Sequence, residues 1–442
     1  MKKLLILISF SLLFGCEKTS QNVQTPEALS DGNTVNFETV KKIALINHNE
    51  LDTVSTKTLK NVEVTVGDST EIDSNFVIKD KKGRDALHVF KYKNKKGWNI
   101  IAGDNRLFPI LAYSKNGEAK LDTSLNHGLK FWVEDILLQI DYMDANNIKQ
   151  SKGIAAEWKK YEKGEMQLKN YQEDGEGGNE SGGVYCTPSS EIWAIWDNNI
   201  NDWTGVTGLT WNQTAGYNYY SHPDYCGPLA NYCNKFPAGC GPVAIGMVMR
   251  YYQRPISFSF SGTQRTANYG VMPSGIDGID CSAPTTAVEE TAALLNGAAG
   301  KYAFDVCTSV NFWPFYTHSE SSTALYPWNI SQTFSDFGYS SPGNKIDYSS
   351  NKNRLISNLK AHQLVIFSGS TCDVCLWNAH IWFCEGLKET ISMQCVINDE
   401  VYMNWGWGGS DNGWFGVSNS FNTDHHGTYN NANMKIIVDI KP

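Results

Sequence analysis

A cysteine at the start of a predicted helix constrains this chain more than any other feature of its sequence. The run Gly-Cys-Gly-Pro at 239–242 leads into apolar residues, and a later proline, Pro255, ends the pattern. Proline suits the first turn of a helix because its missing N–H is not needed there, so the spacing predicts a helix over 242–252. The positive end of a helix dipole favours a thiolate, which makes Cys240 a candidate nucleophile. A structural core cysteine is the alternative interpretation.

The length and composition indicate a multidomain globular protein. A chain of 442 residues exceeds one typical domain, and its 41% hydrophobic content can build sizeable cores. The net charge is −9 and the sequence contains no basic stripe, so a nucleic-acid partner is not expected. The pair His425-His426 lacks cysteines or carboxylates at ligand spacing, and we expect neither a metal site nor any other cofactor.

The first residues are typical of an export signal. Lys2 and Lys3 precede an apolar run over 4–14, which is too short to span a bilayer, and Gly15-Cys16 follows it. This segment is similar to a bacterial lipobox, which predicts lipidation of Cys16 after removal of the signal. An ordinary secretory signal is the alternative. We therefore expect attachment to the bacterial cell envelope, facing the periplasm or the exterior, or secretion.

Export also permits disulfide bonds. Apart from Cys16 and Cys240, an odd number of cysteines remains, so at least one of them stays unpaired within the chain: Cys186, Cys226, Cys233, Cys281, Cys307, Cys372, Cys375, Cys384 and Cys395. The Cys372-x-x-Cys375 pair has no second pair of this kind beside it. A loop disulfide or free thiols are therefore favoured over a zinc site.

Changes in composition divide the chain into consecutive parts. Residues 1–16 form the signal and 17–34 a polar tether, while 164–184 include a Gly/Glu-rich run that cannot bury enough apolar surface to order itself. Within 35–163 the patterns predict a helix from Phe37, a hairpin of 86–92 and 98–102, a strand over 107–113 and a helix over 128–143. This order indicates a small α+β domain.

The remaining part, 185–442, is predicted to form a second α+β domain. Helices are expected at 242–252, 287–295 and 352–360, and strands at 365–369, 379–387, 394–397, 400–404, 414–417 and 434–440, with a tight turn at Asn398-Asp399. Helices therefore come before antiparallel strands, with Cys240 on an early helix and His380 on a late strand.

Four segments resemble the streptopain family of papain-like cysteine peptidases. They are 209–218, which contains Trp211-Asn212-Gln213; 239–251, which contains Cys240; 378–386, which contains Ala379-His380; and the highly specific run Asn-Trp-Gly-Trp-Gly-Gly-Ser-Asp-Asn-Gly-Trp-Phe at 404–415. Segments 86–90, 100–106 and 109–114, ahead of Trp132, are similar to the family's inhibitory prodomain. The resemblance implies a papain-like catalytic domain, with a helical lobe and an antiparallel β lobe, behind a small α+β prodomain.

The resemblance also implies a role for each matching residue. Cys240 would attack the scissile carbonyl, and His380 would stabilise its thiolate, protonate the leaving amine and activate water. Gln213 would donate a hydrogen bond to the oxyanion, and Asn404 would orient the His380 ring. Without the family pattern, Gln213 is a surface amide and Asn404 a turn residue.

Three further residues are expected to shield the site or shape its substrate pocket: Trp405, Trp407 and Gly239. For the tryptophans, plain core packing is the alternative. The chain departs from the family pattern at Gly241-Pro242 after the nucleophile and at Cys384 on the histidine strand. Neither departure removes a catalytic group.

The sequence as a whole predicts a secreted, lipid-anchored cysteine endopeptidase made as a zymogen. It would act on protein or peptide substrates, be inhibited by its own prodomain and be held at the membrane by its lipid anchor. A catalytically silent papain-fold lipoprotein that only binds, and an acyl transferase with the same dyad, are the alternatives. The intact set of Gln213, Cys240, His380 and Asn404 argues against a silent protein.

Overall fold

The computed structural model describes residues 32–53, 71–115, 127–163, 189–194, 209–214, 216–223, 233–276, 285–300, 302–312, 315–370, 379–392, 397–417 and 433–442. Outside them lie the predicted signal with Cys16, nearly all of the tether, the linker at 164–184, the Cys372/Cys375 pair and His425-His426. In the described ranges, no helix has both the length and the apolar character needed to cross a bilayer.

The described residues of the N-terminal domain, within 32–163, form three α-helices and four antiparallel strands. Its elements are α1 (Phe37–Thr53), β1 (Ile72–Lys79), β2 (Asp85–Tyr92), a 3-10 turn η2 (Lys93–Lys95), β3 (Trp98–Ala102), β4 (Ile110–Ser114), α2 (His127–Ala145) and α3 (Lys152–Lys163). The predicted first helix, hairpin and long helix are confirmed. The strand predicted over 107–113 begins three residues later, and β1 and α3 were not predicted.

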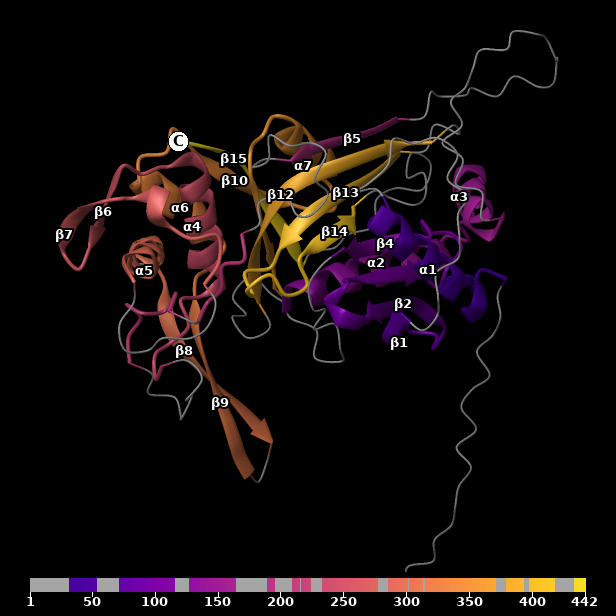
Figure 1. Ribbon diagram of the computed structural model, residues 1–442, viewed down its shortest axis with the longest axis horizontal. Coiled ribbons are helices and arrows are strands. Elements are labelled where there is room, and N and C mark those ends of the chain that lie inside the picture. The colour runs from indigo at the N-terminus through magenta and orange to yellow at the C-terminus, as the bar shows by residue number, and fades with distance from the viewer. Residues whose placement is uncertain are drawn as a thin grey trace, which may run out of the picture.

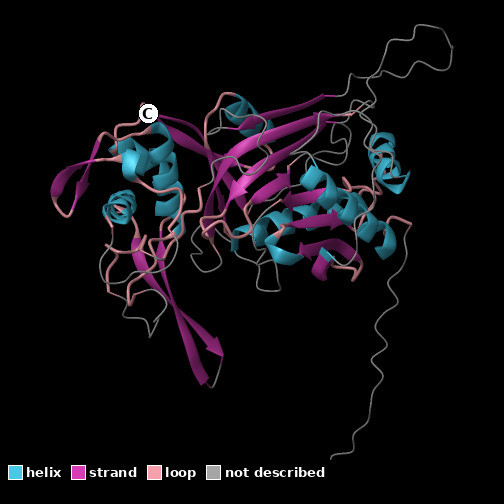
Figure 2. Ribbon diagram, viewed as in Figure 1, coloured by secondary structure: helices cyan, strands magenta, loops and turns pink. Residues whose placement is uncertain are grey.

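The C-terminal domain, from 189 onward, has two lobes that differ in content (Figures 1 and 2). The helical lobe contains α4 (Cys240–Tyr252), β6 (Ser257–Phe260), β7 (Thr263–Thr266), η4 (Tyr269–Val271), α5 (Thr286–Ala299), β8 (Phe304–Phe312), β9 (Phe315–Ala324) and α6 (Trp328–Asp336). The β lobe contains β5 (Ser189–Ala194), β10 (Ser341–Asp347), α7 (Lys352–Lys360), β11 (Val365–Gly369), β12 (His380–Ile391), β13 (Ile397–Asn404), β14 (Gly413–Gly416) and β15 (Met434–Lys441). The predicted α+β class with helical and antiparallel lobes is confirmed.

One antiparallel sheet runs through both domains. Its strand order is β1-β2-β3-β4-β14-β13-β12-β11-β15-β10, and β5 pairs with β12 off this path. The junction is the pairing of β4 with β14, which aligns Tyr113 with Trp414 and Ala112 with Phe415. In Figure 1 the N-terminal domain therefore lies on one side of the β lobe and the helical lobe on the other.

The helix α2 packs across the β lobe and covers the ends of its central strands. Phe131 lies so close to Gly369, the last residue of β11, that a Cβ there would meet the ring at 2.1 Å. Gly369 is the register partner of His380 at the start of β12. The indole Nε1 of Trp132 donates to the carbonyl of Gly416 at 3.1 Å. The N-terminal domain thus contacts the C-terminal domain through both its sheet and this helix.

Two differences from the sequence predictions have clear physical reasons. The tight turn predicted at Asn398-Asp399 is wrong, because both residues lie in β13 and pair with Thr390 and Glu389 of β12. Pairing along a long hairpin here outweighs the local turn preference of Asn and Asp. Strand β10 was missed because it contains Pro342 and Gly343, which an edge strand tolerates.

His88 of β2 is a buried histidine without a polar partner. Its side chain is 2% exposed, and neither ring nitrogen has a hydrogen-bond partner in the described chain. The ring of Phe37 lies 5.9 Å away, centroid to centroid. Burial lowers the pKa of His88, the charge of Asp85 opposes this, and Lys79 adds to the lowering. The folded N-terminal domain therefore favours the neutral imidazole.

Acid should destabilise the N-terminal domain through this residue. A histidine whose folded pKa is lowered leaves stability intact above its unfolded pKa of about 6.5 and removes stability as the pH falls below it. Hydrogen exchange of the β2 amides, corrected for intrinsic rates, should therefore lose protection between about pH 7 and about pH 5. His88→Leu should reduce this pH dependence, whereas His362→Asn, at an exposed site after α7, should not. Equal pH dependence in His88→Leu and the parent chain would show that protonation of His88 does not cause the loss of protection.

Candidate active site

The fold sets Cys240 at the first residue of α4. Gly239 precedes it with φ 93°, a backbone conformation that glycine adopts without strain. A Cβ on Gly239 would also lie 2.5 Å from the carbonyl oxygen of Thr323. Both the turn and this close approach therefore require glycine before the thiol. The helix begins at Cys240, two residues earlier than the predicted start at 242.

The thiol of Cys240 lies against the start of β12. Cys240 is a free thiol of intermediate exposure. Burial raises its pKa, and backbone hydrogen bonds involving Ile381, Gly241 and Cys240 itself offset part of that rise. Ile381 directly follows His380, so the N-terminus of α4 and the predicted histidine strand meet here. In this form of the chain, burial outweighs the favourable field of the helix N-terminus.

The imidazole of His380 is buried and held between aromatic rings. Its side chain is 2% exposed, and its Nε2 lies 2.9 Å from the carbonyl oxygen of Trp405. A carbonyl oxygen can only accept, so Nε2 carries the proton in this contact. The rings of Trp382 and Trp407 lie nearly parallel to the imidazole, with centroids at 6.0 and 5.6 Å.

Asn404, the last residue of β13, is fully buried beside this histidine. Its Nδ2 donates to the carbonyl of Leu209 at 2.9 Å, and its Oδ1 accepts from the N–H of Gly406 at 3.2 Å. Neither of these bonds reaches His380, so the orienting role of Asn404 stays a prediction. The Oδ1 atom can accept a second hydrogen bond because an amide oxygen has two lone pairs.

Gln213 presents an unused donor close to the cysteine loop. Its side chain is 4% exposed, and its Nε2 is buried without a hydrogen-bond partner among the described residues. The backbone carbonyl of Gln213 accepts from Ala238 at 2.7 Å, two residues before Cys240. A buried donor without a partner is costly unless a ligand or a reaction uses it.

The two tryptophans of the glycine-rich turn differ in their contacts. Trp405 is fully buried, its Nε1 donates to Asp411 at 2.9 Å, and its N–H donates to Asn412 Oδ1 at 3.1 Å. Trp407 is half-buried, stacks on His380, and its Nε1 has no hydrogen-bond partner in the described ranges. Trp405 therefore combines core packing with the contact to the histidine, while Trp407 forms a wall of the site.

The first turn of α2 covers this histidine from the N-terminal domain. A Cβ on Gly128 would lie 2.4 Å from Cε3 of Trp405 and 2.7 Å from Cδ2 of His380. Such distances are far below van der Waals contact, so only glycine fits here. Gly128 was not predicted from the sequence to be a site residue. The one signal available was its position at the start of an amphipathic helix.

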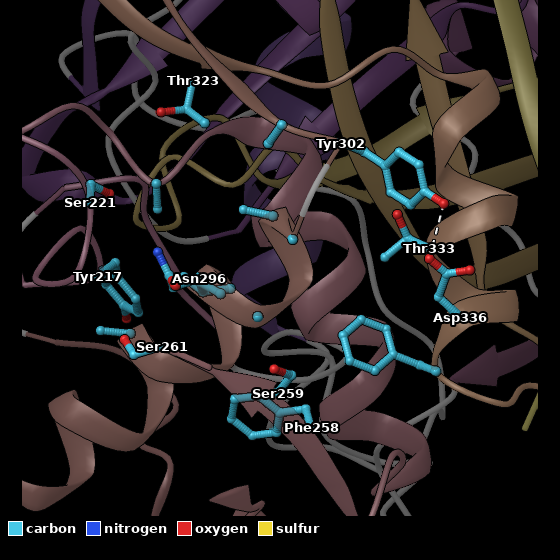
Figure 3. A pocket seen from close by; sticks show the side chains of 18 of the residues that line it. Tyr217, Ser221, Phe258, Ser259, Ser261, Asn296, Tyr302, Thr323, Thr333 and Asp336 are labelled. Carbon is cyan, nitrogen blue, oxygen red and sulfur yellow. Dashed lines mark hydrogen bonds between the residues drawn. The ribbon is translucent and has the colours of Figure 1, made fainter. Parts of the chain in front are cut away.

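A cavity of about 800 Å³ lies in the helical lobe, apart from the dyad (Figure 3). Its walls come from the β6–β7 hairpin, α5, the residues around Tyr302 and α6, and in one wall Tyr302 donates to Asp336 at 2.9 Å. Ala238 and Thr323 belong to its lining, but Cys240 and His380 do not. The cavity therefore adjoins the loop before the thiol without containing it.

Comparison with known proteins gives two family matches. Residues 211–415 match the model of the peptidase C10 family, and residues 44–140 match that of the Spi protease inhibitor. No curated protein sequence matches the chain. A solved prointerpain A fragment from Prevotella intermedia is similar at 14% identity, with 83% of this chain and 98% of that chain covered and a TM-score of 0.47. Active interpain A cysteine protease from the same organism is similar at 14% identity, with 52% and 91% covered and a TM-score of 0.33.

The raised pKa of Cys240 makes a prediction about thiol reactivity in the intact chain. Iodoacetamide reacts with the thiolate, so alkylation of Cys240 should be slow at neutral pH and should rise over a range above about pH 8.5, the ordinary cysteine pKa. Site-resolved mass spectrometry of the full-length chain measures this rate, and the urea-denatured chain is the control. A reaction that has already reached its plateau at neutral pH would contradict the burial of the thiol.

Proposed function

The chain belongs to the peptidase C10 family of streptopain-type cysteine endopeptidases, and we propose from this premise that Cys240 and His380 become its working pair only when the N-terminal domain leaves. The protein is a cysteine protease zymogen, and the N-terminal domain is its inhibitory prodomain. The observation that carries the proposal is that Cys240 contacts the backbone at Ile381 while the Nε2 of the neighbouring His380 lies 2.9 Å from the carbonyl oxygen of Trp405.

Latency then has a direct cause in the contacts of α2. Gly128 lies in close contact with the rings of His380 and Trp405. Phe131 packs on Gly369, the register partner of His380. While α2 is seated, the imidazole cannot move away from the Trp405 carbonyl, and the buried thiol stays protonated. Departure of α2 frees the space that the imidazole needs to turn toward Cys240 and take its proton.

Hydrolysis follows through an acyl-enzyme. The Cys240 thiolate attacks the peptide carbonyl, and the oxyanion is held by the Nε2 of Gln213 and the N–H of Cys240. The imidazolium of His380 gives its proton to the leaving amine, which departs as the C–N bond breaks. Water then loses a proton to His380, attacks the thioester carbonyl and releases the carboxylate product and the thiol.

Asn404 and Trp407 support this pair. After the imidazole has moved, the second lone pair of the Asn404 amide oxygen would accept from its outer N–H and fix the ring. Trp407 would continue to cover one face of the imidazole and limit the access of water to the Asn404 contact.

We also propose the processing and location of the protein from its sequence. The signal would be 1–16 with Cys16 lipidated, the tether 17–34, the inhibitory domain 35–163, the activation linker 164–184 and the peptidase domain 185–442. A protease exported to the cell envelope must stay inactive until it has left the cell. An N-terminal domain joined through a cleavable linker provides that control, because cleavage turns an intramolecular contact into a weaker intermolecular one.

Casein hydrolysis by the purified chain tests the proposed activity. The wild-type chain should release free peptide termini with reductant present, and an epoxide thiol inhibitor should stop the release. Cys240→Ala should abolish it while changing the free energy of unfolding by about 1 kcal/mol or less. The variant should also stay full length if processing is autocatalytic. Amide-linked products would indicate acyl transfer, and a folded wild type without turnover after cleavage would indicate a binding protein.

Replacing Gly128 tests the proposed cause of latency. Helix propensity alone would make Gly128→Ala stabilising by about 1 kcal/mol. The clash with Trp405 and His380 predicts the opposite, because overpacking costs about 1–3 kcal/mol and should lift α2 from the site. We expect initial hydrolysis of a short fluorogenic peptide by the uncleaved chain, and loss of the full-length band, to rise about tenfold or more.

Lys130→Ala, in the same first turn of α2, is the matched control, since its side chain is 41% exposed. It should leave both rates near those of the parent chain. A Gly128→Ala chain as latent as Lys130→Ala would show that the contact with His380 does not maintain latency.

A further inference from the structure

The N-terminal domain covers an edge strand of the peptidase sheet that is shaped to receive a backbone. Strand β14 lies at the edge of the β lobe and pairs with β4 only through the contact between domains. A Cβ on Gly413 would lie 2.6 Å from the carbonyl oxygen of Tyr113, and one on Gly416 would lie 3.2 Å from that of Leu111. Glycine at both ends of β14 therefore lets an extended chain approach closely.

A half-buried lysine beside this edge holds one side chain of β4. The Nζ of Lys388 donates to the hydroxyl of Tyr113 at 2.9 Å and forms an ion pair with Glu400 at 2.9 Å. The side chains of Lys388 and Glu400 are 17% and 5% exposed. Burial disfavours the charge of Lys388, but Glu400 and Tyr113 outweigh this and raise its pKa. The lysine is therefore charged when the strand is in place.

Aromatic rings complete the pocket for that side chain. Tyr113 is 4% exposed and packs with Trp414, which meets Tyr402 edge to face at 5.4 Å. The Lys388 ammonium also lies 5.2 Å from the centre of the Tyr113 ring. This small cluster, separate from the main core, recognises an extended strand with a phenol at one position.

Removal of the N-terminal domain, which the proposed function requires, leaves this edge and its pocket open. We propose that β14 then serves as an exosite that binds an extended segment of a protein substrate as an added antiparallel strand, with a tyrosine in the place of Tyr113. An added strand gains affinity from main-chain hydrogen bonds and specificity from such a pocket. This inference rests on the proposed peptidase activity.

A substrate fits the exosite better than a second copy of the chain does. The four residues of β14 are Gly-Trp-Phe-Gly, which bring no hydroxyl to Lys388 if two such edges pair. The position also favours a substrate, because β13 separates β14 from β12, the strand that begins at His380. A strand added to β14 lies three strand spacings, about 14 Å, from β12 across the sheet, so a segment bound there is tethered on the lobe that carries His380.

Binding of a synthetic peptide tests the exosite without any change that threatens folding. The probe has the sequence of residues 107–115, Leu-Phe-Pro-Ile-Leu-Ala-Tyr-Ser-Lys, with blocked ends. It should bind to the enzyme obtained by processing the full chain, purified from the released domain and blocked at Cys240 by an epoxide. The peptide with Tyr113→Phe should bind about tenfold more weakly, because it loses a hydrogen bond to a charged group. A scrambled peptide, and the unprocessed Cys240→Ala chain with its edge occupied, should show no binding.

Activity assays then show whether the edge serves substrate. In the unblocked processed enzyme, the probe should slow casein cleavage but not hydrolysis of a short fluorogenic peptide. Lys388→Met should weaken casein cleavage in the same selective way, whereas Lys360→Met, which removes an exposed ion pair with Glu389, should not. Equal inhibition of both substrates by the probe, or no difference between the Tyr113 and Tyr113→Phe peptides, would overturn the exosite. Absence of short-peptide hydrolysis would instead overturn the peptidase activity itself.

Discussion

The contact between the first turn of α4 and the first residues of β12 is the interaction on which the rest of the arrangement depends. It brings the helical lobe, which carries Cys240, against the sheet that carries His380. The same strand pairs with β11, β13 and β5, and α2 packs on it from the N-terminal domain. A single strand therefore carries His380 and contacts both the α4 turn that holds Cys240 and helix α2 of the N-terminal domain.

Under the proposed function, two separate features of the structure keep Cys240 and His380 inactive. The imidazole is held by a carbonyl acceptor and two nearly parallel indole rings, and the thiol is protonated because it is buried. Neither mechanism alters the chemistry of the residues. The Nε2 of Gln213, the proposed oxyanion donor, is buried without a hydrogen-bond partner among the described residues. Under the proposed function, Cys240, His380 and Gln213 are therefore in place before activation, and activation changes their access to one another.

The sequence predicted the elements whose apolar residues repeat with a clear period. It did not predict features that depend on contacts between residues far apart in the chain. Helix α7 and strand β11 have the predicted bounds because their apolar patterns are local. Strand β1, with mostly exposed or half-buried residues, has no alternating signal and exists through its pairing with β2. The candidate residues Cys240 and His380 were predicted from motifs, but the bond from His380 to Trp405 and the role of Gly128 depend on how α2 docks. No local pattern contains that information.

The joining of β4 to β14 also has a consequence for the order of folding. Trp132 and Gly416, which meet at this junction, are 284 residues apart in the chain. Strands β1 to β4 are consecutive and pair with their neighbours, so their loops close at low entropic cost and their sheet forms early. The β lobe takes its strands from the far end of the chain and must close much longer loops. A completed N-terminal sheet offers the β lobe an edge of fixed register, so the domain that silences the enzyme also shortens the search by which the enzyme folds.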